Sequence, residues 1–452
     1  MLKNIESKIF ITVFILIALH ATPDGAQSNR YLDAIHSLVS AGTFALQKGY
    51  LSHIDVVSVN DNFYAVIPPG VPLLLAPLYF LHRSIMSVMG IPIGGDYWAI
   101  FNFLSNALVT APLLGLVAIM MFKTLSKFTE NTAKKLWLVF IFIFGSLIFF
   151  YSTNGIWSHV YTMTFLFTGF YLIINHKNNF LIGLCLGWAQ LFDYIAIIPI
   201  SLLMGFWLYK NMKFNLIKLS QNSFFLLLGY AVFLSALLFY NYSITGSIFQ
   251  TPNSLYLQEL NRQGIGTRTM LSLPALGTLW GLTFSPHRGI FLYFPMTFLF
   301  IASLVKKSFI KNDLCLFSAI FVTFIFIFNA TYYAWSGDVC FGPRHLVVAI
   351  PFIIIPIVYS PLKYIKILGA ISIFINLAGV STIPSSNLFI NIFMFLYRGL
   401  FLHSLDYVYK IVLPKYYNLE ISLMTPFFIY VATAWLIYLI WKPNFSQKPN
   451  LA

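Results

Sequence analysis

The sequence predicts an all-α, polytopic membrane protein with about twelve transmembrane helices. Hydrophobic residues make up 59% of the 452 residues, charged residues make up 9%, and the mean hydropathy is +0.81. A soluble chain of this length would expose far more charge. Apolar runs of roughly twenty residues, the length that spans a bilayer, recur along the whole chain. Because a β-barrel would show short alternating segments instead, we interpret residues 1–452 as a single transmembrane domain.

The first apolar run, Ile9–Ala21, follows Lys3 and Lys8. Two interpretations fit this pattern. The run is short for a membrane span and ends in a small residue, as a signal peptide does before its cleavage site. We favour an uncleaved first helix, since neighbouring residues would lengthen it. In either case, we expect the following stretch, residues 22–96, to be exported.

The later spans are expected in the following segments: 97–122, 136–152, 158–175, 180–209, 223–242, 288–305, 313–330, 344–360, 367–381 and 421–441. The segment 180–209 is too long for one crossing at about 1.5 Å per residue. It contains Asp193 and Pro199 near its middle. We therefore expect a tight hairpin or a broken pair of helices there, which places both termini inside and gives about twelve crossings.

The net charge of +14 raises the question of nucleic-acid binding. Most of the positive charge comes from lysines in short loops between apolar runs, and this pattern orients a membrane protein. A nucleic-acid-binding domain would instead gather its basic residues on one face. We therefore expect no nucleic-acid partner.

Arginine and lysine are distributed differently across this topology. Seventeen of the twenty lysines fall in inner segments. All seven arginines fall in outer segments: Arg30, Arg83, Arg262, Arg268, Arg288, Arg344 and Arg398. Membrane proteins usually keep both cations inside, so the outer arginines need another explanation. The guanidinium fork suits phosphate, which favours a phosphate-bearing lipid as the ligand.

Three outer segments are long: 22–96, 243–287 and 382–420. In the first, apolar residues recur at helical spacing around Arg30–Ala41, and this predicts an amphipathic helix. Two prolines and a glycine then precede the apolar run Leu73–Leu81. They predict a rigid turn into a helix that lies in or near the membrane interface.

The first outer loop is rich in acidic residues: Asp24, Asp33, Asp55 and Asp61. Exported loops are polar, so each of these residues also has an ordinary explanation as a solvated side chain. Together with Arg30 they predict a site with a general base and a phosphate clamp. Asp193 is different, because a carboxylate within an apolar segment is costly unless it is solvated or paired. We expect it to face a cavity, either in a proton pathway or as a structural part of a broken helix.

Two outer loops place an arginine at the start of an apolar segment. They are Ser285-Pro-His-Arg-Gly289 and the glycine-bearing loop that ends in Gly342-Pro-Arg-His345. Snorkelling to lipid headgroups is one explanation of these arginines. The repeated arrangement favours Arg288 and Arg344 as ligands of a lipid phosphate. Further candidates for the substrate site are His159, His345, Tyr64, Arg262 and Arg268.

Several catalytic motifs are absent from the sequence, namely a Walker loop, a Gly-x-Ser-x-Gly elbow and an HExxH metal helix. Cys185, Cys315 and Cys340 are scattered, so neither a disulfide framework nor a metal site is indicated. The sequence also has no large cytosolic domain that would bind a nucleotide sugar. An enzyme of this shape must use an activated substrate that is already in the membrane.

Seven short motifs, in order over nearly the whole chain, resemble the GT-C class of integral-membrane glycosyltransferases, especially its bacterial mannosyltransferase-like branch. The motifs are Ser28-Asn-Arg-Tyr31 with His36-Ser-Leu-Val39, Phe63-Tyr-Ala-Val-Ile-Pro-Pro-Gly70, Tyr151-Ser152 with His159, Gly187-Trp-Ala-Gln-Leu-Phe-Asp-Tyr194, Tyr240-Asn-Tyr242 with Gly246, Phe284-Ser-Pro-His-Arg-Gly289, and Phe341-Gly-Pro-Arg344. Each motif alone is weakly specific, so the resemblance depends on their common order.

The resemblance implies a polyprenyl-phosphate-linked sugar donor and an inverting transfer to a lipid, glycan or protein acceptor. It places the site on the outer, periplasmic side of the plasma (inner) membrane. Arg344, Arg288 and Arg30 would hold the donor phosphate. No cofactor is required, although a divalent metal assists in some members of the class.

The resemblance also implies that a carboxylate of the first outer loop deprotonates the acceptor hydroxyl. Asp24 fits the position of this acid best. The Asp-Glu pair of many relatives is absent, and Gln27-Ser28 lies near its place. Asp33 and Asp55 therefore stand as substitutes.

A transporter or flippase of lipid-linked sugars is the alternative function. It would share the basic outer face and the intramembrane Asp193. A transporter commonly contains related halves, and we find no convincing internal repeat in the sequence. A ligase or polymerase that moves a whole glycan would keep the chemistry of the glycosyltransferase and change the acceptor.

Overall fold

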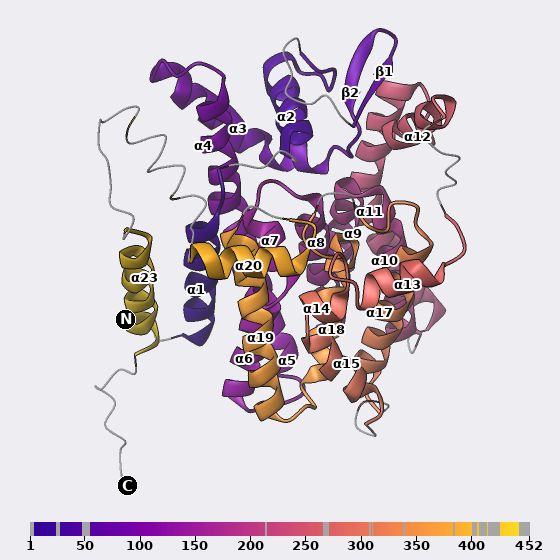
Figure 1. Ribbon diagram of the computed structural model, residues 1–452. Helices are drawn as coiled ribbons and strands as arrows, with labels where there is room; N and C mark the ends of the chain where they lie inside the picture. Colours follow the sequence, from indigo (N-terminus) through magenta and orange to yellow (C-terminus); the bar gives the residue numbers. More distant parts are fainter. Residues whose placement is uncertain are drawn as a thin grey trace.

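A computed structural model describes residues 4–23, 28–47, 55–212, 215–264, 271–306, 309, 311–337, 340–382, 385–399, 405, 414 and 425–442. These residues form a helical bundle with one small two-stranded sheet (Figure 1). The expected all-α class is therefore confirmed apart from this hairpin.

The bundle consists of α1 (Ile5–His20), α4 (Gly95–Ser105), η2 (Asn106–Thr110), α5 (Ala111–Leu125), α6 (Thr132–Phe144), α7 (Leu147–Thr153), α8 (Ser158–Ile174), α9 (Asn179–Phe192), η3 (Tyr194–Ala196), α10 (Ile197–Asn211), α11 (Leu216–Thr245), α14 (Ile290–Tyr293), α15 (Met296–Leu304), α17 (Asp313–Thr331), η4 (Arg344–Ala349), α18 (Ile350–Ile357), α19 (Leu362–Ser381) and α23 (Thr425–Trp441). The other elements are α2 (Asn29–Ala41), β1 (Val56–Val59), β2 (Asn62–Ala65), α3 (Gly70–Val88), α12 (Pro252–Arg262), α13 (Leu276–Thr283) and α20 (Leu388–Arg398). Figure 1 shows α2, the hairpin, α3 and α12 together at one end of the molecule.

Several helices are long and apolar enough to cross a bilayer. Among the described residues there are six, or seven if α6 and α7, which meet at a 50° bend, count as one span. The longest is continuous over 31 residues through α4, η2 and α5. This supports a multi-pass membrane protein.

The expected break in the segment 180–209 is confirmed. Helix α9 ends at Phe192, and the chain turns at Asp193 before η3 and α10 continue. The side chain of Asp193 caps the new helical segment, because its Oδ1 accepts the backbone N–H of Ile195 at 3.0 Å. The carboxylate therefore ends one helix and starts the next.

The structure differs from the expectation in two other segments. The expected span 288–305 is interrupted between α14 and α15 at Pro295, which has no backbone N–H to continue the helix. In the first outer loop, α2 is confirmed, and α3 is longer than the expected Leu73–Leu81 run. The hairpin β1–β2 was not expected; its two-residue turn, Asn60–Asp61, has positive φ at both positions, as a type I′ turn requires.

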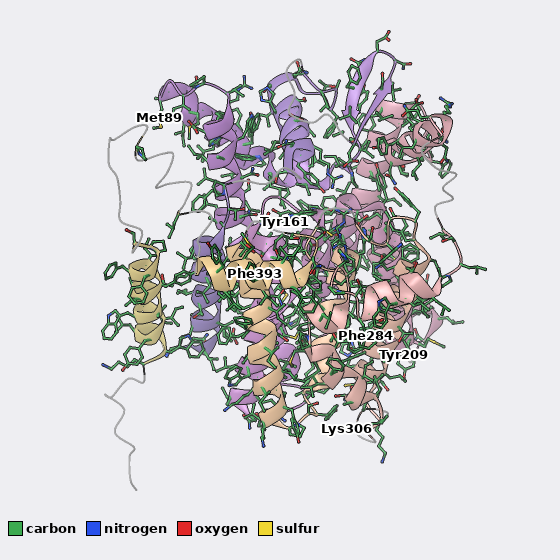
Figure 2. All side chains as sticks on the ribbon, in the orientation of Figure 1. Met89, Tyr161, Tyr209, Phe284, Lys306 and Phe393 are labelled. Atoms are coloured by element: carbon green, nitrogen blue, oxygen red, sulfur yellow. The ribbon has the colours of Figure 1, made fainter. Side chains whose placement is uncertain are left out.

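Lysines cap helices at one end of the bundle, which we call the lysine end. Their ammonium groups donate to carbonyls at or just beyond helix C-termini: Lys127 to Ile174 (3.4 Å), Lys134 to Val358 (3.1 Å) and Lys306 to Tyr359 (2.8 Å). These carbonyls carry the negative end of the helix dipole. Helices α8 and η4–α18 run toward this end, and Arg344 starts η4 at the opposite end. Figure 2 labels Lys306 at the lysine end and Met89 near the opposite one.

Glycines let α9 and α11 pack in close contact. A Cβ atom on Gly183 would overlap the backbone of Leu226, and one on Gly229 would overlap the backbone of Phe180. Small residues at such positions allow membrane helices to approach closely. Gly70, at the start of α3, likewise packs against the backbone of Leu191, two residues before the break at Asp193. The end of α9 is thus fixed from two sides.

We expect Gly183→Ala to destabilise the protein and Gly205→Ala to leave it unchanged or slightly more stable. The first substitution inserts a methyl group between two backbones, which costs about 1–3 kcal/mol. Gly205 lies on α10, and a Cβ atom there would meet no neighbouring heavy atom within 4 Å, so alanine gains only helix propensity. Melting temperatures in detergent will compare the two variants. Equal melting temperatures would contradict the proposed packing of α9 on α11.

Candidate functional site

A cavity of about 690 Å³ lies at the end of the bundle opposite the lysine end. Segments that are far apart in the sequence form its walls: the start of α2, the residue before β1, the start of α8, the break after α9, one face of α12 and the start of η4. Its charged and imidazole side chains are Arg30, Asp55, His159, Asp193, Arg344 and His345. The structure thus brings together candidates from both the first outer loop and the loop before η4.

Arg30 and Asp55 form an ion pair on one wall of the cavity. The Arg30 Nη1 lies 2.9 Å from the Asp55 Oδ2, and both side chains are partly exposed. The start of α2, which carries Arg30, is fixed because the Ser28 hydroxyl accepts the backbone N–H of Ile156 at 2.8 Å. Asp55 has a φ of 56°, a left-handed conformation that is uncommon for residues other than glycine. Such backbone conformations cluster at functional sites.

Asp193 and His159 form a second pair on the cavity floor. The Oδ2 of Asp193 lies 3.7 Å from the Nδ1 of His159, at the start of α8. The ring of His159 meets the ring of His345 edge-on, with centroids 5.2 Å apart. The charges of Arg30 and Arg344 also act on His159. The carboxylate inside the apolar segment therefore faces a cavity, as expected, and has both a backbone and an imidazole partner.

Arg344 lines the cavity at the start of η4. Its guanidinium carbon lies 5.8 Å from the centre of the Trp157 ring. The backbone of Gly337, with a φ of 68°, passes directly under the side chain, and a Cβ atom there would lie 2.7 Å from the Arg344 Nε. Among the described residues, Arg344 forms no salt bridge, and its buried Nε has no hydrogen-bond partner. No ion pair within the described part of the chain would have to break before this arginine bound an anion.

Arg288 does not line the cavity. Its buried guanidinium donates to backbone carbonyls of several loops: those of Ser336, His287 (2.6 Å), Cys340 (3.1 Å) and Ser386 (3.3 Å). These contacts hold together the loop before α14, the loop before η4 and the segment before α20. The structure gives Arg288 a structural role next to the site, and its expected contact with the donor phosphate stays a prediction.

The other predicted residues lie outside the cavity lining or outside the described residues. Asp33 is buried in α2, and Tyr64 pairs with Val57 in the hairpin. Arg262 is 77% exposed at the end of α12, where it faces Glu259 at 3.6 Å. Asp24 and Arg268 belong to segments that the structure does not describe.

The cavity also contains residues that the sequence did not single out. Helix α12 presents Asn253, Tyr256 and Leu260 to it, at the spacing of one helical face. Thr251, whose side chain accepts the N–H of Ser254 at 3.0 Å, precedes a proline at the first helical position. A Thr-Pro start of this kind predicts a helix, and it could have identified α12 within the outer loop 243–287.

The chemistry of the cavity has three parts. Two arginines and two carboxylates offer charge, and two histidines offer proton transfer. Aromatic side chains provide flat surfaces on which apolar faces pack: Tyr31, Phe192, Tyr194, Tyr256, Tyr332 and Tyr333. Within the described part of the chain, no three His, Cys, Asp or Glu side chains are grouped so that they could hold a metal ion.

No family model, curated protein or solved structure matches this chain. The cavity and the side chains that line it are therefore the basis for inferring the function.

Arg288 and Arg344, two of the three arginines expected at the phosphate, should differ in their effect on stability. Arg288→Ala leaves buried carbonyls without a donor, so we expect a loss of about 3 kcal/mol or more. Arg344→Ala removes mainly the contact with the Trp157 ring, which is worth about 1 kcal/mol. Melting temperatures of both variants in the same detergent will test this. An equal decrease for the two variants would contradict the structural role of Arg288.

Proposed function

We propose that this chain is a GT-C-like membrane glycosyltransferase. It moves a sugar from a polyprenyl-phosphate-linked donor to a lipid, glycan or protein acceptor, with inversion at the sugar carbon. The observation that carries the proposal is a single cavity that holds both Arg344, which has no carboxylate partner among the described residues, and the Arg30–Asp55 ion pair of the first loop. A phosphate-binding group and a carboxylate base are the two requirements of this reaction.

In the proposed reaction, a first-loop carboxylate takes the proton of the acceptor hydroxyl. The hydroxyl oxygen attacks the anomeric carbon of the donor from the face opposite the phosphate. The bond between this carbon and the phosphate oxygen breaks, and the electron pair leaves with the lipid phosphate. Arg344 stabilises the charge that develops on the phosphate. Because a lipid phosphate is a good leaving group, the orientation of the two substrates supplies much of the rate.

Three carboxylates of the first loop are candidates for the base. Asp24 is the acid that the family resemblance favours, and it directly follows Pro23, whose carbonyl accepts from Asn102 at 3.4 Å. Asp55 is the first-loop acid in the cavity lining. Asp33 is the weakest candidate, since it is buried in α2 and does not line the cavity. No cofactor is required by this scheme, and a divalent metal would assist by neutralising the phosphate.

The proposed topology has about twelve crossings, with the lysine end in the cytoplasm and the cavity on the outer, periplasmic side of the plasma (inner) membrane. The positive-inside rule supports this orientation, because the lysines gather at one end of the bundle. A donor that carries its own leaving group needs no nucleotide on that side. The partners are therefore a membrane lipid and an acceptor, with no nucleic acid.

A transporter or flippase of lipid-linked sugars is the second candidate. The helix break at Asp193 favours it, since broken helices with an intramembrane carboxylate also occur in transporters. Proteoliposomes loaded with acceptor extract and supplied with radiolabelled polyprenyl-phosphate mannose separate the two functions. Label in a new glycosidic bond supports the enzyme, whereas donor movement between leaflets without a new bond supports the transporter.

Arg344→Ala should weaken donor binding about 10- to 100-fold, as expected for the loss of one charged hydrogen-bonding group. Arg262→Ala is the matched control, because Arg262 is exposed and lies outside the cavity lining. Radiolabelled donor binding and the KM for donor, measured in the proteoliposomes described above, will compare the variants. Unchanged donor binding by Arg344→Ala would contradict its assignment to the phosphate.

Neutralising the catalytic carboxylate should abolish transfer and preserve donor binding. We expect Asp24→Asn or Asp55→Asn to reduce the transfer rate by about 100-fold or more, since general base catalysis contributes this much. The variant that loses transfer and still binds donor identifies the base. Asp61→Asn, in the hairpin turn, is the control. Normal transfer by both Asp24→Asn and Asp55→Asn would refute the assignment of the base to either residue.

A further inference from the structure

The cavity continues into a small recess in its floor. The recess has a volume of about 30 Å³, which is enough to admit a small polar group such as a hydroxyl. It shares His159, Asp193, Ile195, Tyr332 and His345 with the lining of the large cavity, so the two spaces adjoin. Its deeper walls are formed by α8, η3, α10, α17 and η4.

Asn329, near the end of α17, lines the recess and is absent from the lining of the large cavity. It is 2% exposed, and among the described residues neither its amide oxygen nor its amide nitrogen has a hydrogen-bond partner. The buried Nε2 of His345, on the neighbouring wall, also lacks a partner within the described structure. The surrounding wall is largely apolar, with Ile325 and Phe328 next to Asn329 on α17. A buried amide that stays unpaired costs about 1–3 kcal/mol, so this site is built to bind a polar group.

The chemistry of the recess selects a hydroxyl group. An asparagine amide donates through its nitrogen and accepts through its oxygen, and a hydroxyl matches both functions at once. The carboxylate of Asp193 disfavours any anion, and the nearby charge of Arg344, which acts on His345, disfavours a cation. A neutral group that both donates and accepts remains.

We propose that the recess binds one hydroxyl group of the donor sugar and thereby sets donor specificity. This inference rests on the proposed glycosyltransferase function. The donor is assigned to the recess because Arg344, the proposed phosphate ligand, is adjacent to His345, and the sugar is bonded directly to that phosphate. The α12 wall, with Asn253 and Tyr256, then faces the acceptor. The donor is accordingly a sugar that carries a free hydroxyl at the position that enters the recess.

The consequence is strong discrimination against a deoxy sugar. A site that is built around a hydroxyl rejects the analogue that lacks it, because the buried polar groups are then left unpaired. A recess that only excluded bulk would discriminate far less between sugars that differ by one oxygen atom. Asn329 is thus a specificity-determining residue, and it takes no part in bond making or breaking.

The experiment uses full-length protein in proteoliposomes and a donor series: polyprenyl-phosphate mannose and its four monodeoxy analogues, with kcat/KM measured for each. We expect wild-type protein to transfer one of the deoxy sugars at least about 100-fold less efficiently than mannose. Asn329→Leu, which has a similar volume and no polar atoms, should lower kcat/KM for mannose and remove the discrimination at that one position. Asn211→Leu is the matched control, since Asn211 is also buried and lies at the far end of α10.

The outcomes separate this inference from the proposed function. If wild-type protein transfers mannose and all four deoxy sugars within about threefold of each other, the recess does not bind a donor hydroxyl and the glycosyltransferase function still stands. The same conclusion follows if a folded Asn329→Leu protein keeps the wild-type discrimination. If wild-type protein forms no glycosidic bond with polyprenyl-phosphate mannose or with any other polyprenyl-phosphate hexose, the proposed function fails and the inference fails with it. The wild-type series is decisive even if Asn329→Leu does not fold.

Discussion

The cost of placing a carboxylate inside an apolar segment is the constraint on which the site depends. Asp193 interrupts a stretch that would otherwise continue as one long helix, and its side chain caps the segment that follows. Breaking the helix leaves backbone groups without their helical hydrogen bonds and opens space beside the carboxylate. The backbone groups and the charge then need other partners. His159 and the cavity supply them, and the glycine contacts of α9 with α11 and of Gly70 with Leu191 hold the broken end in place. The cavity therefore lies beside Asp193, whose carboxylate needs polar surroundings.

In the sequence, all seven arginines share one property, a position in an outer segment. The structure shows that the arginines it describes have different partners. Arg288 joins three loops through backbone carbonyls, Arg30 is neutralised by Asp55, and Arg344 has no carboxylate partner among the described residues. These roles are linked, because Arg288 holds the carbonyls of Ser336 and Cys340, which flank the glycine under Arg344. One buried arginine thus positions the backbone that presents the other to the cavity.

Local patterns allowed much of the fold to be predicted. The helix over Arg30–Ala41 and the break near Asp193 follow from periodicity and from the cost of a buried charge, which are properties of neighbouring residues. The hairpin was not predicted, because its strands are only four residues long and its turn, Asn60–Asp61, lacks the glycine that marks most two-residue hairpin turns. The partners of Arg288 could not be predicted, since the carbonyls of Ser336 and Ser386 lie far away in the sequence. The set of residues that line the cavity could not be predicted for a similar reason, because they come from segments far apart in the sequence.

The two carboxylates in the cavity are suited to different tasks. Both oxygens of Asp193 are engaged, one by the backbone N–H of Ile195 and the other by His159. Asp55 uses only one oxygen for Arg30 among the described contacts, and it lies in the cavity lining without a helix to cap. Asp55 is also the more exposed of the two side chains, at 32% against 23%, so it is more accessible to an acceptor hydroxyl than Asp193. Asp193 instead lies beside His159, whose ring meets that of His345 in the recess that Asn329 also lines.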